Sequence, residues 1–492
     1  MLLLGWFKQH EALHWFCPEA EAVPQDLTTL GIAVAAAMIR ERKITSEALI
    51  RALIAKANKS KSLNAFITLD EAAAIKAAKK ADAMTAAGES CGPLHGIPIA
   101  IKDNIEVVGM PNTAGTPALM NFIPKSNAPV VQKLVDAGAI MFGKTNLHEL
   151  AFGTTTVNAT FGAAGNPYDP KRFAGGSSGG SAAAVSARIA PGSLATDTVG
   201  SIRIPAAFCG VVGLRPTVGR YPGGGVAPVS YTFDTSGPIA RSVSDIAILD
   251  HVIAGGAPIE PAVLSELRLG VPREYFYEGV DPEIARVTEA ALAKLKAAGV
   301  AIVEVDLPGA ADVLNGIAVP ITMYEAMCDL PHYLDASKTG VSMEELVAKI
   351  ASPDVGDPFA SMFTGEKAVP PDIYREAMAG REKHRKNMAQ YFADNKLSGM
   401  IVPATPALAG LIEDELKELE LKVQRVSASK FFLRNTIVTS TAGTPGLILP
   451  AGLTNDGLPV SLELDGPEGS DRRLLSIGLA MEELFGTLPA PI

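Results

Sequence analysis

Cysteine is scarce in this chain of 492 residues, which contains four. No two of them form a C-x-x-C pair, since they stand at Cys17, Cys91, Cys209 and Cys328. A disulfide framework or a thiolate zinc site needs closer or regularly spaced cysteines, and low cysteine usage fits a reducing, cytoplasmic setting. The seven histidines contain no H-E-x-x-H motif. The sequence therefore predicts no metal site, and nothing in it indicates a cofactor.

The chain also lacks a basic tract and a long apolar run. It carries 43 Lys and Arg against 53 Asp and Glu, a net charge of −10. Binding a phosphate backbone needs clustered positive charge, so the sequence predicts no nucleic-acid partner. No segment reaches the roughly 18 to 20 apolar residues of a membrane span, which predicts no membrane partner. The apolar start ends at Lys8 and has no cationic region before it, so we interpret residues 1–25 as an N-terminal extension without a targeting role.

What the chain does have is the composition of a large globular protein, with 48% hydrophobic and 20% charged residues. Its length exceeds the size at which one hydrophobic core usually stops growing, which favours two domains. Residues 28–85 show helical spacing and predict two or three helices. Short apolar runs predict buried strands at 97–102, 139–142, 300–305, 400–402 and 447–449.

One strand–helix–strand unit can be followed in detail. Leu267–Val271 is strand-like, Asp281 is placed to cap a helix that begins at Pro282, and Gly299 can end it before the strand at 300–305. This order predicts an α/β sheet covered by helices. Residues 310–395 mix Met, Tyr, Phe and Pro with helical fragments, which suggests a helical insertion over a pocket.

Glycine accumulates between residues 151 and 230, which hold 15 of the 46 glycines. Glycine serves where the backbone needs a positive φ or must approach a neighbour closely. The segment contains the stretch Gly175–Ser181 and the stretch Asp197–Ala206. Such glycine–serine stretches are usually flexible linkers. Here apolar residues follow each stretch directly, at Ala182–Val185 and around Ile202 and Ile204, so we expect both to be embedded in the core.

Three separated stretches carry a resemblance to a known family. They are Gly96-Ile97-Pro98 through Lys102-Asp103-Asn104, the double-serine loop Gly175–Ser181, and Gly200-Ser201-Ile202-Arg203-Ile204-Pro205. Further matches are Gly143–Asn146, Gly213–Thr217 and Leu449–Val460. From about residue 28 to the C-terminus the chain resembles the amidase signature enzymes. The resemblance implies their α/β fold over residues 26–492: a twisted, mixed central sheet with helices on both faces, a catalytic core at about 90–250, and a helical insertion at about 310–395 over the pocket.

The resemblance also implies a catalytic triad. Position by position, the family's lysine corresponds to Lys102 and its nucleophile corresponds to Ser201. The family's relay serine follows a cis peptide bond and corresponds to Ser177. A serine hydroxyl is a weak nucleophile until a base takes its proton. Lys102 must therefore be neutral, although a free lysine titrates at about pH 10.4. Burial at the end of an apolar strand would lower its pKa, because desolvation penalises the charged form.

The loop around Ser201 carries the remaining predicted site residues. By resemblance, the backbone N–H groups of Thr198, Val199, Gly200 and Ser201 bind the oxyanion of the tetrahedral intermediate. Gly176 and Ser178 support the double-serine loop, and Asp197 and Arg203 form a pair that holds the nucleophile loop.

One position departs from the family pattern, which has Gly-Gly where this chain has Val199-Gly200. A β-branched residue rarely adopts a positive φ. We therefore expect a negative φ at Val199 rather than a distorted oxyanion hole, and the side chain would narrow the acyl pocket.

A competing motif lies at Gly138–Thr145, which fits the phosphate-loop pattern G-x-x-x-x-G-K-T. That motif works as a loop between a strand and a helix. Here the intervening residues are apolar and strand-like, so we interpret Lys144 as part of the amidase-like core and not as a nucleotide ligand.

The substrate is less closely defined. The stretches Gly219–Pro222, Asp234–Pro238 and Leu464–Pro467 are most similar to hydrolases of arylacetamides such as indoleacetamide and mandelamide. They favour a small aryl amide substrate for this chain. Other readings stay open: a urethane or ester substrate, the glutaminase subunit of a tRNA amidotransferase, and a binding scaffold weakened by Val199. The sequence is also compatible with a homodimer.

Overall fold

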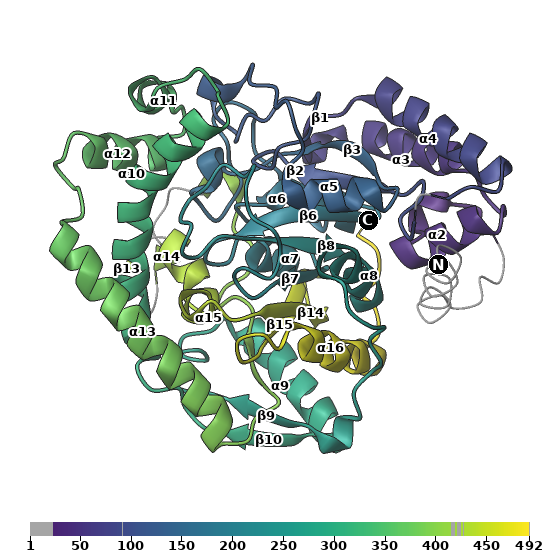
Figure 1. Ribbon diagram of the computed structural model, residues 1–492. Helices are drawn as coiled ribbons and strands as arrows, with labels where there is room; N and C mark the ends of the chain where they lie inside the picture. The colour runs from purple at the N-terminus through teal and green to yellow at the C-terminus, as the bar shows by residue number, and fades with distance from the viewer. Residues whose placement is uncertain (1–22, 91, 415–418, 421–424, 427, 492) are drawn as a thin grey trace, which may run out of the picture.

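A mixed β-sheet of eleven strands runs through the protein (Figure 1). The computed structural model describes residues 23–90, 92–414, 419–420, 425–426 and 428–491, so residues 1–22 of the predicted extension lie outside the described residues. In spatial order the strands are β1 (Phe66–Thr68), β3 (Ile140–Thr145), β2 (Pro98–Lys102), β6 (Gly192–Asp197), β8 (Thr235–Ala240), β7 (Val212–Arg215), β14 (Gly446–Leu453), β15 (Pro459–Asp465), β11 (Gly399–Pro403), β9 (Arg268–Val271) and β10 (Ala301–Glu304). Two short hairpins pair β4 (Gly165–Asn166) with β5 (Asp169–Phe173) and β12 (Leu419–Glu420) with β13 (Arg425–Val426).

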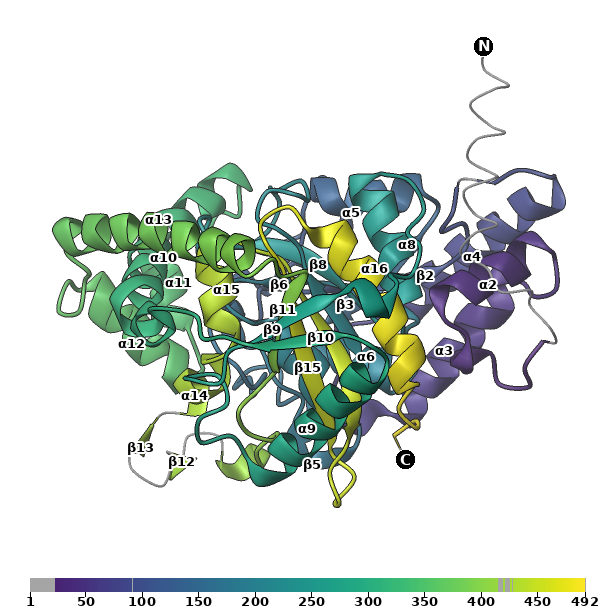
Figure 2. The ribbon, with the colours of Figure 1, turned by 90° about the horizontal axis from the view of Figure 1, so that it is seen from below.

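Helices cover both faces of the sheet, which confirms the predicted α/β architecture (Figures 1 and 2). They are α2 (Ile32–Arg40), α3 (Ser46–Lys59), α4 (Glu71–Ala86), α5 (Pro129–Asp136), α6 (Gly179–Ser186), α7 (Arg203–Phe208), α8 (Val243–Ala254), α9 (Pro282–Ala297), α10 (Val319–Ala336), α11 (Met343–Lys349), α12 (Pro353–Phe363), α13 (Pro371–Asp394), α14 (Ala428–Leu433), α15 (Thr436–Ala442) and α16 (Asp471–Phe485). In the part of the chain that the structure describes, no helix combines the length and the apolarity needed to cross a membrane.

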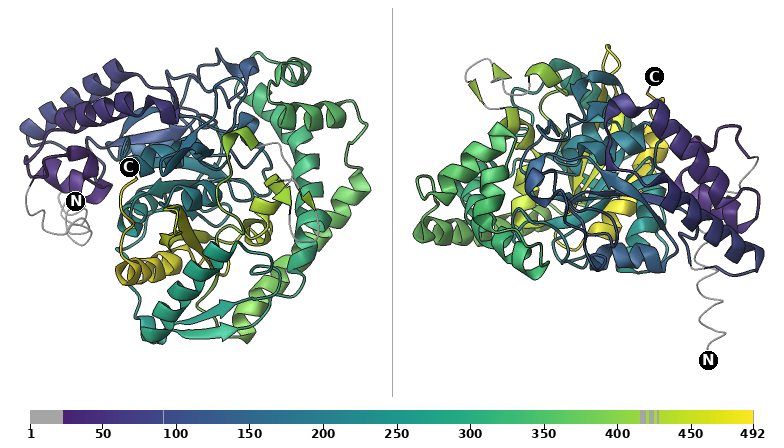
Figure 3. Two further views of the ribbon diagram at one scale, coloured as in Figure 1. Left: turned by 180° about the vertical axis from the view of Figure 1, so that it is seen from behind. Right: turned by 90° about the horizontal axis from the view of Figure 1, so that it is seen from above.

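The helices at the two ends of the molecule come from different parts of the chain. Helices α2 to α4 lie at one end, and α10 to α13 lie at the opposite end (Figures 1 and 3). The second group occupies the segment 310–395, where the sequence predicts a helical insertion. That this group covers a substrate pocket stays a prediction.

The strand–helix–strand unit predicted after residue 267 is confirmed. The Asp281 carboxylate accepts the N–H of Glu283, and Pro282 opens α9. The strands β9 and β10 on either side of this helix pair in parallel. A strand, a crossover helix and a parallel strand form one βαβ unit, in which the helix packs back against the sheet.

The N-terminal part of the prediction is incomplete. Residues 28–85 do form three helices, α2, α3 and α4, but the sheet-edge strand β1 between α3 and α4 was not predicted. It spans three residues, pairs antiparallel with β3, and is half-buried throughout. Three residues are too few to show the alternation that identifies a strand in a sequence.

The centre of the sheet lies inside the hydrophobic core. Ile448 lies in β14 between β7 and β15 and is fully buried. Interior side chains are closely packed, so a large-to-small change leaves a cavity that the neighbours fill only in part.

We therefore expect Ile448→Ala to lower the free energy of unfolding by about 2 to 5 kcal/mol. The matched control is Ile373→Ala, because Ile373 is 40% exposed on α13, and it should change that value by no more than about 0.5 kcal/mol. Urea-induced unfolding followed by circular dichroism measures both. Equal losses in the two variants would contradict this account of the core.

Candidate active site

The order of strands brings the predicted catalytic residues to one edge of the sheet. Lys102 is the last residue of β2 and Asp197 is the last residue of β6, and these two strands are parallel neighbours. Since parallel strands end at the same edge, Lys102 and the chain that leaves β6 meet there. Four residues after Asp197 the loop reaches Ser201, and α7 begins at Arg203.

Ser177 enters the same region from the turn that precedes α6. The peptide bond between Gly176 and Ser177 is cis. The backbone N–H of Ser178 donates to the carbonyl oxygen of Ser201 at 3.2 Å, which joins the double-serine loop to the nucleophile loop. A Cβ on Gly176 would come within 2.5 Å of the Thr155 backbone nitrogen, so only glycine allows this close approach.

Lys102 is fully buried, and its Nζ lies 2.7 Å from Ser177 Oγ and 2.9 Å from Thr196 Oγ1. Burial lowers the pKa of Lys102 to about 7, although the carboxylates of Asp197 and Asp234 act in the opposite direction. A lysine ordinarily keeps its proton until about pH 10.4, so this environment makes the neutral amine available near neutral pH. Lys102 and Ser177 are thus placed for proton transfer.

A buried ion cluster holds the loop on both sides of Ser201. The Asp197 carboxylate lies 3.1 Å from Arg203 Nη2 and 2.8 Å from Arg215 Nη1, and it accepts the N–H groups of Gly200 and Ile202. Burial alone would raise the pKa of Asp197, but the two guanidinium groups and these hydrogen bonds outweigh it and hold the pKa below its ordinary value. The predicted pairing of Asp197 with Arg203 is present, and Arg215 was not predicted as its second partner.

Val199 and Gly200 adopt the conformations that the sequence suggested. Val199 is not among the described residues with a positive φ, whereas Gly200 has a φ of 144°. A Cβ on Gly200 would also lie 2.4 Å from Thr436 Oγ1, so this position admits only glycine. The same Thr436 hydroxyl donates to the Val199 carbonyl oxygen at 2.6 Å and fixes the loop from α15.

The predicted oxyanion donors are not equivalent. The N–H of Gly200 donates to Asp197 Oδ1 at 2.8 Å, so it is already engaged, contrary to the expectation that it faces the substrate. In the part of the chain that the structure describes, the N–H groups of Thr198, Val199 and Ser201 have no such acceptor. The hydrogen bond from the Gly200 N–H to the Asp197 carboxylate fixes this turn.

The phosphate-loop-like stretch at Gly138–Thr145 is part of the sheet. Residues Ile140–Thr145 form β3, as the strand interpretation predicted. Lys144 is fully buried, and its Nζ contacts Asp103 at 2.9 Å and Asn112 Oδ1 at 2.7 Å. A lysine paired inside the core has no free charge for a nucleotide phosphate.

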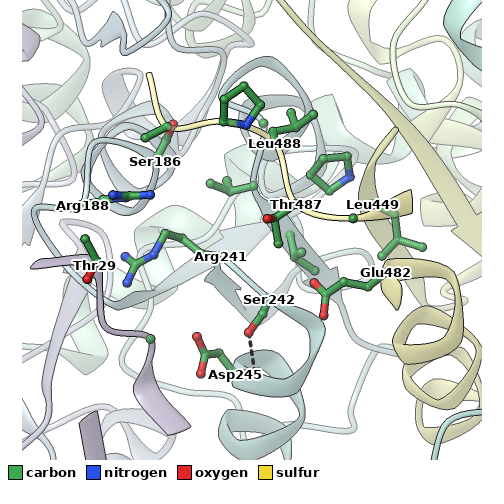
Figure 4. Close-up of a pocket in the computed structure, with 18 of the residues that line it drawn as sticks. Thr29, Ser186, Arg188, Arg241, Ser242, Asp245, Leu449, Glu482, Thr487 and Leu488 are labelled. Carbon is green, nitrogen blue, oxygen red and sulfur yellow. Dashed lines mark hydrogen bonds between the residues drawn. The ribbon is translucent and has the colours of Figure 1, made fainter. Parts of the chain in front are cut away.

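A cavity of about 340 Å³ lies elsewhere, between the start of α2, the start of α8 and the end of α16 (Figure 4). Arg188, Arg241, Asp245 and Glu482 contribute charged groups to its wall. None of the predicted catalytic residues lines it. Among the described residues, no group of three or more His, Cys, Asp and Glu side chains is arranged to hold a metal ion.

Besides Arg215 and Thr436, two further residues of the site were missed by sequence reasoning. Thr196 accepts hydrogen bonds from both Lys102 and Asn104, and the Asp234 carboxylate accepts the hydroxyl of Thr198 at 2.5 Å. Thr196 could have been found from its position in an apolar strand, one residue before Asp197. Asp234 belongs to a stretch that contributed to the family resemblance, but nothing local reveals that β8, which follows it, lies beside β6.

Comparison with known proteins places the chain in a family. The family model called Amidase matches residues 48–475. Mandelamide hydrolase of Pseudomonas putida is 43% identical over 485 residues, which cover 96% of this chain and 94% of that protein.

The chain belongs to the amidase family. It is therefore a hydrolase that acts on amide C–N bonds. Indoleacetamide hydrolase of Agrobacterium vitis is 40% identical over 446 residues, or 90% of this chain and 95% of that protein. A solved crystal structure of an amidase superposes with a TM-score of 0.83 at 34% identity and covers 93% of this chain and 100% of the other. The amidase signature fold expected from the sequence motifs is confirmed.

The ion cluster of this amidase yields a stability prediction. Arg203→Met would leave Asp197 and Glu463 buried with one partner fewer, and breaking a buried ion pair in this way costs about 3 to 5 kcal/mol of unfolding free energy. The control Arg51→Met removes an exposed pair with Glu47 and should leave the urea midpoint nearly unchanged. An Arg203→Met protein with the wild-type midpoint would show that the cluster does not stabilise the fold.

Proposed function

We propose that this amidase hydrolyses a small aromatic amide through an acyl-enzyme formed on Ser201. The observation that supports it best is the short contact between the buried Lys102 amine and the Ser177 hydroxyl, in a loop that is hydrogen-bonded to Ser201. Two side chains that can pass a proton are thus in contact, and a backbone hydrogen bond joins the loop of one of them to Ser201. Nothing in this chemistry calls for a metal or a cofactor.

In the proposed reaction the neutral Lys102 accepts a proton from Ser177, and Ser177 takes one from Ser201. The Ser201 oxygen then forms a bond to the amide carbonyl carbon. When the C–N bond breaks, the same relay returns the proton to the departing nitrogen, which leaves as ammonia or an amine. Water then attacks the acyl-enzyme carbonyl carbon and gives a proton to the relay. The ester bond to the Ser201 oxygen breaks, the relay returns the proton to that oxygen, and the carboxylic acid is released.

The N–H groups of Thr198, Val199 and Ser201 are proposed to bind the negative oxygen of the tetrahedral intermediate. Removing one donor from such a site costs about 3 kcal/mol in other acyl-transfer enzymes. The Asp197 cluster would serve this step indirectly, because its hydrogen bonds to the N–H groups of Gly200 and Ile202 fix the loop that carries these donors.

The aromatic preference is supported by two observations. The relatives that share about 40% of the sequence are named for mandelamide and indoleacetamide, in which an aryl group lies close to a carboxamide. Val199, two residues from Ser201, packs against an apolar cluster that contains Phe233, Ile437 and Val438. An apolar wall beside the nucleophile suits an aryl acyl group and offers no partner for a charged one.

The first test is ammonia release from phenylacetamide, indoleacetamide, mandelamide and glutamine by the wild-type enzyme and by Ser201→Ala. We expect turnover of at least one aryl amide, and a loss of at least about a thousandfold in the variant, because removing a serine nucleophile abolishes the covalent route. Ser265→Ala, a change of an exposed serine remote from the site, is the matched control and should keep full activity.

Three outcomes would contradict the proposal. Turnover of glutamine alone, increased by added amidotransferase partner subunits, would identify the glutaminase function instead. Aryl amide binding without ammonia release would identify a binding scaffold. Preferential cleavage of matched aryl esters or urethanes would reassign the substrate while leaving the triad in place.

The pH dependence of kcat/KM tests the role of Lys102. Only the neutral amine can accept a proton, so the rate should fall about tenfold per pH unit below the Lys102 pKa of about 7 and should level off above it. Lys102→Arg keeps a positive charge at every accessible pH and should be inactive across the whole range. A wild-type profile that stays flat from pH 5 to 9 would refute a neutral-lysine base.

A further inference from the structure

The Asp234 carboxylate lies at a junction between two loops of the active site. Its Oδ2 accepts the N–H groups of Val229 and Ser230 at 2.9 and 3.1 Å. Its Oδ1 accepts the hydroxyl of Thr198 at 2.5 Å. One buried carboxylate therefore ties the turn at 229–234 to the loop that leads to Ser201.

A second contact joins the same two loops through the backbone. Arg215 Nη1 donates to the carbonyl oxygen of Thr198 at 3.0 Å, and Nη2 donates to the carbonyl oxygen of Phe233 at 2.8 Å. Thr198 is thus held by both its hydroxyl and its carbonyl group, which leaves its own N–H and that of Val199 with a defined direction.

Helix α10 is also hydrogen-bonded to this turn. Glu325 accepts the hydroxyl and the N–H of Thr232 at 2.5 and 3.1 Å, and the hydroxyl of Ser230 at 2.5 Å. Asp329, one turn further along α10, accepts the N–H of Tyr231 at 2.8 Å. The position of Asp234 is therefore set by the packing of α10 as well as by the sheet.

Asp234 also acts on Lys102 through its charge. Lys102 from β2 and Arg215 from β7 interact with this carboxylate through their charges. Glu325 and Asp329 from α10 bind neighbouring residues of the same turn. Burial raises the pKa of Asp234 to about 6, and the Thr198 hydroxyl opposes that rise. Asp234 is therefore ionised near pH 7, where Lys102 titrates, and its negative charge favours the protonated amine.

We propose that Asp234 is a positioning residue of this active site, which orients Thr198 in the loop before Ser201 and sets the electrostatic environment of Lys102. The inference rests on the proposed function, in which Lys102 is the base and the Thr198 loop binds the oxyanion. Asp234 does not touch the substrate in this role. It acts through two neighbours, and each effect can be removed separately.

Asp234→Asn removes the charge and keeps the shape of the side chain. Without that charge Lys102 loses its proton more readily, so the acid limb of kcat/KM should move to lower pH by about half a unit or more. Thr198→Val removes the hydroxyl and keeps the carboxyl group of Asp234, whose pKa then rises because the hydroxyl no longer opposes the effect of burial. It should lower kcat by about tenfold or more at pH 9, where Asp234 is ionised in the variant and in the wild type.

Asp329→Asn is the matched control, because it removes a carboxylate that binds the same turn but does not contact Thr198. Its acid limb should coincide with that of the wild type. If Asp234 had only a structural role, Asp234→Asn would lower kcat/KM by the same factor at every pH. An acid limb of Asp234→Asn at the wild-type position would therefore overturn the proposal. If that variant fails to fold, wild-type kcat in Thr198→Val overturns it independently.

A readout without an amide separates this inference from the proposed substrate. A fluorophosphonate probe labels an activated serine, and mass spectrometry of the Ser201 peptide follows its rate between pH 5 and 9. If the labelling rate shows the predicted pH shift in Asp234→Asn but no amide is hydrolysed, the role of Asp234 is retained and the proposed substrate is rejected. Labelling with the same pH midpoint in Asp234→Asn and wild type would reject the role of Asp234 and leave the hydrolase in place.

Discussion

The carboxylate of Asp197 is the constraint on which the rest of the site depends. It lies at the end of β6, fully buried, and two arginines and several backbone N–H groups surround it. Because a buried charge is tolerated only when it is paired and hydrogen-bonded, the chain around it has little freedom. The loop must turn so that the N–H groups of Gly200 and Ile202 point inward, and the Ser201 side chain between them is presented from a rigid frame.

The site also depends on the surroundings of Lys102 at the end of β2. Lys102 is buried without an ion-pair partner in the described part of the chain, while Lys144, on the neighbouring strand β3, is paired with Asp103. The two lysines show that the surroundings decide the state of a buried lysine. Lys144 is paired with a carboxylate and stabilises the core. Lys102 contacts hydroxyl groups only, so the low dielectric of the interior favours its uncharged form.

Much of this arrangement could be predicted from the sequence, because its signals are local. The apolar run that ends at Lys102, the two glycine–serine stretches and the capped helix after Asp281 each show in a few adjacent residues. The ties made by Arg215, Asp234 and Thr436 could not be predicted, since they depend on which strands lie side by side. The order β6–β8–β7–β14 does not follow the chain, and short buried strands carry no information about their neighbours. The engaged N–H of Gly200 was missed for the same reason, because only the folded turn shows which way it points.

The parallel pairing of β2 and β6 lets the segments between these strands vary without moving the ends of the strands. Lys102 ends β2 and Asp197 ends β6, so the lysine and the loop that leads to Ser201 are held at the same sheet edge by hydrogen bonds between these strands. The intervening segments leave that edge and return to it. Their length and composition can therefore change without altering the distance between Lys102 and the loop that carries Ser201. Loops around a conserved sheet edge can vary and change the substrate of an enzyme, while the residues at that edge stay in place.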